Sequence, residues 1–322
     1  SAATFIVDAD LLGLWRRRVA HVRLEGLSIQ ISPKDDHAPG QTLTPEAPPG
    51  SGDASTPDRA DDYLKQVIIA EVEAPDAELT LFPRDERKEP KTWYLHTLRL
   101  QSVSSGTKMP FETVLTNGLP PGLIKATGTF GPWRRDDPGH TPLDGRFTFD
   151  DANLGVFGGI SGTLSAKGTF QGTLDRIETD GETETPDFKL DISQHAVALS
   201  TKYHAIVDGT NGDTMLDPVH ATFNNTSLTA KGGVYAVAGV KGRTVKLDVA
   251  LENGRIEDLM RLAVDSPTSP MTGRVHLTTM LVLPPGTRNV VDKLRLDGRF
   301  VIEGGRFTDA GVQAKINNLS RR

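Results

Sequence analysis

The sequence contains no cysteine, and aromatic residues make up only 6% of its 322 residues. The absence of cysteine excludes disulfides and thiolate metal sites, but it does not fix the compartment. No run of 18 or more apolar residues occurs, so we expect no transmembrane helix within these residues, and no signal peptide is visible. With 37% hydrophobic residues, the chain has little apolar material for a thick core.

Basic residues are also too few to form a nucleic-acid-binding face. The formal net charge is −6, and most of it falls in residues 33–62. Outside that segment, 34 basic residues face 35 acidic ones, so the rest of the chain is almost neutral. Binding to nucleic acid requires a basic surface that neutralises phosphates, so we expect no nucleic-acid partner. Inside the segment, Lys34 and Arg59 are outnumbered by seven acids, which are Asp35, Asp36, Glu46, Asp53, Asp58, Asp61 and Asp62.

The same segment, 33–62, has the composition of a disordered loop. It contains six prolines, three glycines and a single large aliphatic residue, Leu43. Such a stretch cannot bury enough apolar surface to offset the entropy lost on ordering. We therefore predict a loop that joins two neighbouring strands; docking of a partner is the alternative role.

What the sequence does contain is a repeated strand pattern, clearest between Gly128 and Gly233. Short runs of alternating apolar and polar residues are separated by Gly, Pro, Asn or Asp, which is typical of antiparallel strands with one buried face. The 32 glycines and 21 prolines also disfavour a helical protein. The clearest alternation comes late in the chain, at 244–251, 273–283 and 294–302.

Further strands are predicted at 93–100, 111–115, 124–130, 145–149, 162–170, 188–192, 203–207 and 219–223. About 15 to 18 strands are expected in all, with two or three short helices at the ends and edges. Open sheets of more than about ten strands curl, split or flatten. The predicted fold is therefore mainly β: a long, curled, mostly antiparallel sheet that forms an open groove. The predicted helices include Arg255–Val264 and one turn within Asp151–Phe157.

The N-terminal region divides into three parts. Residues 1–32 are predicted to hold a short helix, with Leu11, Leu14 and Trp15 on one face, and the first strand of the groove. That helix either closes the end of the sheet or, with its following arginines, lies on a membrane surface. The apolar parity of the strand at 19–32 switches at Gly26, which predicts a bulge there. The loop 33–62 follows, and residues 63–322 continue the same groove domain.

No motif for catalysis or metal binding satisfies its spacing rule. The stretch Asp208–Thr214 has glycine where a calcium loop of the EF-hand type requires an oxygen ligand, so a polar hairpin turn is expected. His195, His204 and His220 have no carboxylate at metal-site spacing and are expected to be ordinary strand residues, the last two on adjacent strands. The Ser105–Lys108 pair lacks the companion motifs of a serine acyl enzyme. We expect no catalytic residue, no metal and no cofactor.

The amino-acid sequence of several long segments resembles that of the AsmA-like family of bacterial envelope proteins. The resemblance covers much of the chain and rests on LTNGLPPGLIKATGTFGPW (115–133), TPLDGRFTFDDANLGVFGGISGTLSAKGTFQGTL (141–174), PDFKL (186–190), YHAIVDGTNGDT (203–214) and DGRFVIEGGRFTDAGVQAKINNLSRR (297–322).

The resemblance implies a periplasmic domain anchored in the inner membrane by an N-terminal helix that lies outside these residues. It also implies a β-groove of the bridge-like lipid-transfer type, which carries phospholipids between the inner and outer membranes. The absent anchor and the lack of a terminal cap after Arg322 suggest a fragment. A late strand–turn–strand–helix is implied for 297–322.

Three functions are compared. The leading one is a non-enzymatic lipid-binding or lipid-transfer module, in which acyl chains of a phospholipid or other lipid lie on the apolar sheet face. An alternative is an assembly factor for outer-membrane proteins that pairs a free sheet edge with a client strand. An enzyme acting on an envelope glycan or lipid ranks last, because no paired carboxylates or activated nucleophile stand out. The expected lipid-binding residues are Phe147, Phe149, Phe170, Val249, Leu251, Leu277, Leu281, Leu283, Phe300 and Ile302.

Overall fold

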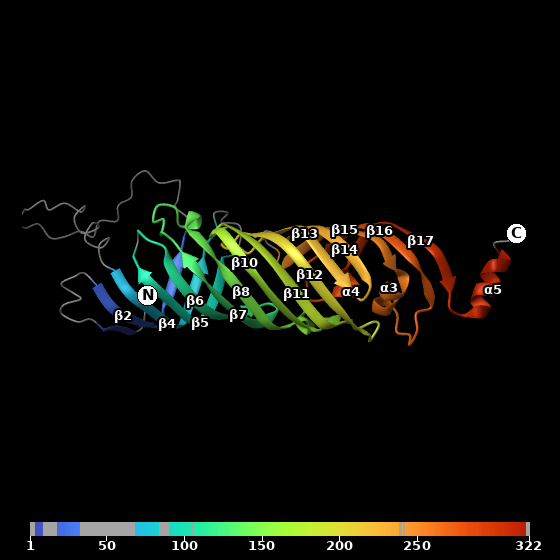
Figure 1. Cartoon of the computed structure of the whole chain (residues 1–322), viewed down its shortest axis with the longest axis horizontal. Coiled ribbons are helices and arrows are strands. Elements are labelled where there is room, and N and C mark those ends of the chain that lie inside the picture. The colour runs from blue at the N-terminus through green and yellow to red at the C-terminus, as the bar shows by residue number, and fades with distance from the viewer. Residues whose placement is uncertain are drawn as a thin grey trace, which may run out of the picture.

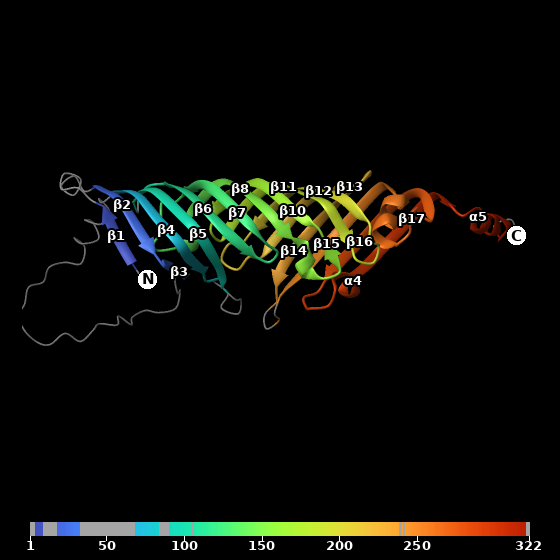
Figure 2. The ribbon, with the colours of Figure 1, turned by 90° about the horizontal axis from the view of Figure 1, so that it is seen from below.

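The computed structural model describes residues 4–8, 18–32, 68–83, 90–104, 106–237, 240 and 242–319. Within them a single sheet of 17 strands runs along an elongated molecule, with the N-terminal strands at one end and the C-terminal helix at the other (Figure 1). The strands cross the long axis obliquely in both views (Figures 1 and 2). The prediction of a mainly β, mostly antiparallel open sheet with short helices is confirmed.

Most strands are longer than the alternation alone predicted. The first half of the sheet comprises β1 (Thr4–Asp8), β2 (Arg18–Glu25), β3 (Ser28–Ile31), β4 (Ile68–Leu81), β5 (Lys91–Val103), β6 (Met109–Gly118), β7 (Pro121–Phe130) and β8 (Pro142–Asn153). The second half comprises β9 (Ile160–Ser161), β10 (Thr163–Thr173), β11 (Arg176–Leu190), β12 (Ala196–Val207), β13 (Thr214–Phe223), β14 (Thr226–Ala236), β15 (Arg243–Arg255), β16 (Met271–Leu283) and β17 (Arg295–Phe307). The helices are η1 (Pro138–His140), η2 (Leu154–Phe157), α3 (Ile256–Ala263), α4 (Val290–Lys293) and α5 (Ala310–Leu319).

Most strands pair with their sequence neighbours as antiparallel hairpins. The exception is at the N-terminal end, where β2 and β3 both run parallel to β4. A parallel pair requires a crossover connection of a dozen or more residues, and the segment between β3 and β4 provides it. The parity switch predicted at Gly26 is confirmed: this glycine has a φ of 63° between β2 and β3, and Val22 and Ile29 both pair with apolar residues of β4.

Opposite ends of distant strands meet, although the outer edges of β1 and β17 stay apart and the sheet remains open. The backbone N–H of Lys91, at the start of β5, donates to the carbonyl of Thr210 between β12 and β13 at 3.2 Å. The N–H of Val290 donates to the carbonyl of Gly158, after η2, at 2.9 Å. Several strands separate the partners in each case. These contacts therefore require the sheet to bow toward one of its faces.

Two small cores lie on that bowed sheet. Ala74, Ala77, Leu95 and Leu115 form the first, against partly buried neighbours such as Trp93. In the second, Leu251 and Val275 are covered by Ile256 of α3. Because α3 contacts β11 and β12 as well as β15 and β16, the sheet bows toward the face on which these cores lie.

Other predictions have mixed outcomes. The helix at Arg255–Val264 and the turn within Asp151–Phe157 are confirmed as α3 and η2. The boundary of the strand at 188–192 is wrong, because β11 begins at Arg176 and ends at Leu190. The strand–turn–strand implied for 297–322 is wrong in form, since β17 runs on to Phe307 before α5 begins. The predicted N-terminal helix around Leu11–Trp15 and the loop 33–62 lie outside the described residues.

Candidate functional site on the apolar face

Every strand contributes to one continuous apolar face, which is defined by the pairing register. Residues that pair directly across a ladder lie on the same side of a sheet, and alternate residues of a strand share a side. Val249 pairs with Ala230 on one side and Thr279 on the other. Following such pairs outward from β15 leads without a break to Phe147 on β8 and then to Leu98 on β5. We refer to this surface as the apolar face.

All ten residues predicted to bind lipid lie on the apolar face. The three phenylalanines come from β8 and β10, where Phe147 pairs with Gly168 and Phe149 with Ala166. The others form rows across β15, β16 and β17, such as Leu251–Leu277–Phe300. The structure therefore places together the residues Phe147, Phe149, Phe170, Val249, Leu251, Leu277, Leu281, Leu283, Phe300 and Ile302.

Exposure differs widely among these ten. Leu251 is only 1% exposed, since α3 packs over it, so it belongs to a closed core and does not line an open surface. Phe300 on the last strand is 66% exposed, and Phe147 and Phe170 are partly buried. The apolar face is thus closed at the two cores, one of them under α3, and exposed at residues such as Phe300.

Glycines and aromatic rings alternate along the middle of this face. The row Phe111–Gly128–Gly145–Phe170 crosses four adjacent strands, and the two rings approach to 6.5 Å between centroids. The glycines leave room for the rings. A methyl group on Gly168, for example, would stand 2.9 Å from Cε1 of Phe147.

The next row is Phe147–Gly168–Gly181–Tyr203. A methyl group on Gly181 would stand 2.5 Å from the hydroxyl oxygen of Tyr203. Burial raises the pKa of Tyr203 above its usual value of 10.0, against the opposing effect of a hydrogen bond with Thr179. The hydroxyl of Tyr203 is therefore partly removed from water on this part of the apolar face.

Sequence reasoning missed several members of this face. Trp93, Leu95 and Phe111 lie on it through β5 and β6, and Leu247 pairs with Leu281. Their own alternation within the predicted strands was the signal that could have found them. Lys91 and Arg243, the charged residues on this face, had no such signal.

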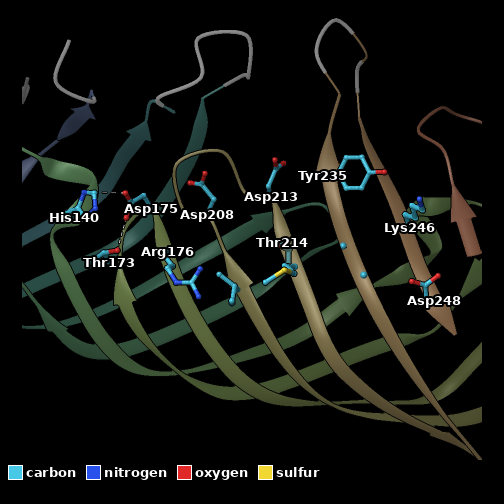
Figure 3. Close-up of a pocket in the computed structure, with 14 residues that line it drawn as sticks. His140, Thr173, Asp175, Arg176, Asp208, Asp213, Thr214, Tyr235, Lys246 and Asp248 are labelled. Atoms are coloured by element: carbon cyan, nitrogen blue, oxygen red, sulfur yellow. Dashed lines mark hydrogen bonds and ion pairs between the residues drawn. The ribbon is translucent and has the colours of Figure 1, made fainter. Parts of the chain in front are cut away.

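The opposite face is polar and carries two hollows. One hollow, of about 710 Å³, lies beside the ends of β10 to β15 (Figure 3). Ile206 and Met215 line it together with Asp175, Arg176 and Asp248. A second hollow contains His204 and His220, which lie on adjacent strands as predicted; Nδ1 of His204 is 2.9 Å from Oδ1 of Asp180. Neither hollow opens on the ten predicted lipid-binding residues.

The Asp208–Thr214 stretch is a turn between β12 and β13, as predicted. Its carboxylates are used by the turn itself: Asn211 donates to Asp208 at 2.6 Å, and Arg243 donates to Asp213 at 2.9 Å. Among the described residues, no group of three or more histidines and carboxylates is arranged to hold a metal ion.

In the part of the chain that the structure describes, no helix has the length and apolar character needed to cross a membrane. No protein-family model matches the sequence, and no curated protein or solved structure matches it either.

Proposed function

We propose that this protein is a non-enzymatic lipid-binding module that carries phospholipid acyl chains along its apolar face. In this proposal it works in the periplasm as part of a protein anchored in the inner membrane, and it moves lipid between the inner and outer membranes to maintain the outer membrane. The single observation that carries the proposal is the apolar face itself, which crosses the sheet and is only partly covered by other elements of the described chain.

An apolar surface of this kind suits acyl chains for a physical reason. Soluble proteins rarely leave a large contiguous apolar patch without a partner. Each methylene that leaves water for such a surface contributes about 0.8 kcal/mol. Because the hydrophobic effect has no direction, a lipid held this way can slide along the rows of Phe, Leu and Gly without breaking specific bonds. No catalytic group is needed.

The alternative is an assembly factor that accepts a client strand at a sheet edge, and the exposure of β17 favours it. Among the described residues, this 13-residue strand forms a ladder with β16 only, and its outer edge is unpaired. Phe300, Leu296 and Val301 on it are 66%, 59% and 49% exposed. Unblocked edges of this length invite strand addition.

The test is to crosslink the protein to its ligands with light in living cells and to identify the adducts by mass spectrometry. A photoreactive phenylalanine analogue at Leu281, on the apolar face, should give lipid adducts. The same analogue at Val282, the next residue on the polar face, should give few. Equal lipid labelling at both positions would contradict the proposal. If the analogue at Phe300 of β17 gave a protein adduct while Leu281 gave no lipid adduct, the assembly factor would be favoured.

A further inference from the structure

Two charged side chains stand out on the apolar face. From β4 to β17, its directly paired positions include only these two, Lys91 and Arg243. Lys91 begins β5 and pairs with Leu81, while Arg243 begins β15 and pairs with Ala236. By parity, Lys91 shares its face with Trp93, and Arg243 shares its face with Val245. The remaining paired positions of this face in β4–β17 are apolar, glycine or uncharged polar.

The turn between β12 and β13 brings these two cations together. Lys91 is bonded to it through its backbone, and the guanidinium of Arg243 donates to the carbonyl of Asn211 and, at 2.9 Å, to Oδ1 of Asp213. A methyl group on Gly212 would stand 2.9 Å from Nη2 of Arg243 and 3.9 Å from Cδ of Lys91. Both side chains therefore flank the same glycine, at the junction of opposite strand ends.

Within the described part of the chain, Lys91 has no anion of its own. Among the described residues its ammonium makes no ion pair, and its Nζ lies 4.7 Å from the centroid of the Trp93 ring. Burial, and then repulsion from Arg243, lower the pKa of Lys91 below its usual 10.5. The nearby carboxylate of Asp208 is occupied by Thr210 and Asn211 of its own turn. A partly buried cation beside a second cation is stabilised when an anion joins them.

We propose that Lys91 and Arg243 together bind the phosphate of a lipid headgroup, while the acyl chains of that lipid lie on the apolar face beside Trp93. This inference rests on the proposed function and adds the headgroup chemistry to it. Lys91 supplies a point charge with three donors. Arg243 keeps N–H donors beyond those used by Asp213 and Asn211, and a guanidinium matches the geometry of phosphate oxygens. Trp93, an amphipathic aromatic residue, lies where headgroup and chains would meet.

The test compares two lipids that differ only in the phosphate. The protein is loaded from maltoside micelles containing dioleoyl phosphatidic acid or dioleoylglycerol, and bound lipid is counted by native mass spectrometry. The wild type should prefer phosphatidic acid by about tenfold, since a charge-assisted contact of this kind is worth roughly one decade of affinity. Lys91→Gln should lose this preference, and Lys91→Arg, which keeps the charge, should restore most of it.

The matched control is Lys246→Gln, on the same strand as Arg243 but on the polar face, which should keep the full preference. A folded Lys91→Gln protein that still prefers phosphatidic acid would overturn the phosphate site and leave lipid binding intact. Failure of every variant to bind either lipid would instead overturn the proposed function. Displacement of phosphatidic acid by equimolar inorganic phosphate would show that the site takes the free ion, against a lipid source.

Discussion

The ring of Phe170 lies over Gly145 of the neighbouring strand, where a methyl group would stand 2.7 Å from the Cζ atom of the ring. Even closer to that position is the carbonyl oxygen of Thr127, on the strand at the other side. A side chain at position 145 would thus clash with both neighbouring strands, so the position requires glycine. It provides the space in which the ring covers the apolar face.

Gly145→Ala should therefore destabilise the protein by about 1–3 kcal/mol, the usual cost of overpacking. Urea unfolding followed by circular dichroism measures this loss. Gly118→Ala on β6 is the control, because nothing lies within 4 Å of its added methyl group. If the two variants lost equal stability, the packing of Phe170 over Gly145 would not be the cause.

Leu281→Asp should leave the protein folded while greatly reducing the lipid that copurifies with it. Leu281 is partly exposed on the apolar face, so water can reach a carboxylate there, but a charge beside acyl chains is costly to desolvate. Val282→Asp is the control. Its carboxylate would lie on the polar face opposite Lys246 and Arg295, the cross-strand partners of Val282, and lipid should be retained.

Lipid extraction and mass spectrometry of both variants checks this prediction. A folded Leu281→Asp protein with its full lipid load would exclude this part of the face from the lipid path. Unfolding of the variant would instead mean that Leu281 belongs to a closed core.

The rows of apolar residues could be predicted because most strands show them as an alternation of apolar and polar residues in their own sequence. In β16, Val275 and Leu277 alternate with Arg274, His276 and Thr278, and this alternation locates the strand and its apolar side, which Leu281 and Leu283 continue at the same parity. The first part of β11 shows no such alternation. Its positions on the apolar face include Thr179, Gly181 and Thr183, so period-two hydrophobicity vanishes and the strand was missed there.

Contacts between strands far apart in the sheet could not be predicted. Lys91 and Arg243 are joined through the turn that holds Thr210, which depends on how the whole sheet bows. Likewise, nothing in the alternation indicated that β3 would run parallel to β4. The direction of this pairing depends on the path of the connection between β3 and β4, and the alternation within a single strand contains no information about that path.

That parallel pairing leads to a prediction about segment 33–62. The last residue of β3, Ile31, pairs with Leu81, which is the last residue of β4. The connection between the two strands must therefore span the whole length of β4 to reach its first residue, Ile68. At about 3.3 Å per residue, the path back is roughly 43 Å. The sequence composition of 33–62 gives it almost nothing to bury, and loop entropy depends only weakly on length.

Replacing 33–62 by a Gly/Ser linker of about 15 residues should therefore change the melting temperature by only a few degrees. Deleting the segment outright leaves too few residues to cover the distance and should abolish the pairing of β3 with β4. Calorimetry of both proteins decides the point. A fall of about ten degrees or more with the long linker would assign the segment a structural role.

The ion pair of Asp213 with Arg243 should contribute more to stability than a surface pair. Oδ1 of Asp213 also accepts the backbone N–H of Ala236 at 2.9 Å, so Asp213→Ala leaves two donors without their partner. A loss of about 2 kcal/mol is expected. Asp217 pairs with Lys231 in a more exposed position, and Asp217→Ala should cost well under 1 kcal/mol. Chemical denaturation measures both; equal losses would contradict the prediction.

Tyr203 should make the protein less stable in alkali, because burial raises the pKa of its hydroxyl in the folded state. Above its usual value of 10.0, the unfolded chain loses this proton while the folded protein keeps it. Unfolding then releases a proton, so the free energy of unfolding falls as pH rises through this window. Tyr203→Phe removes the ionisable group and should reduce the slope, although it is expected to lower stability at neutral pH by removing the hydrogen bond with Thr179. Urea unfolding of both proteins between pH 8 and pH 11 provides the comparison, and parallel curves would show that Tyr203 ionises equally in the folded and unfolded states.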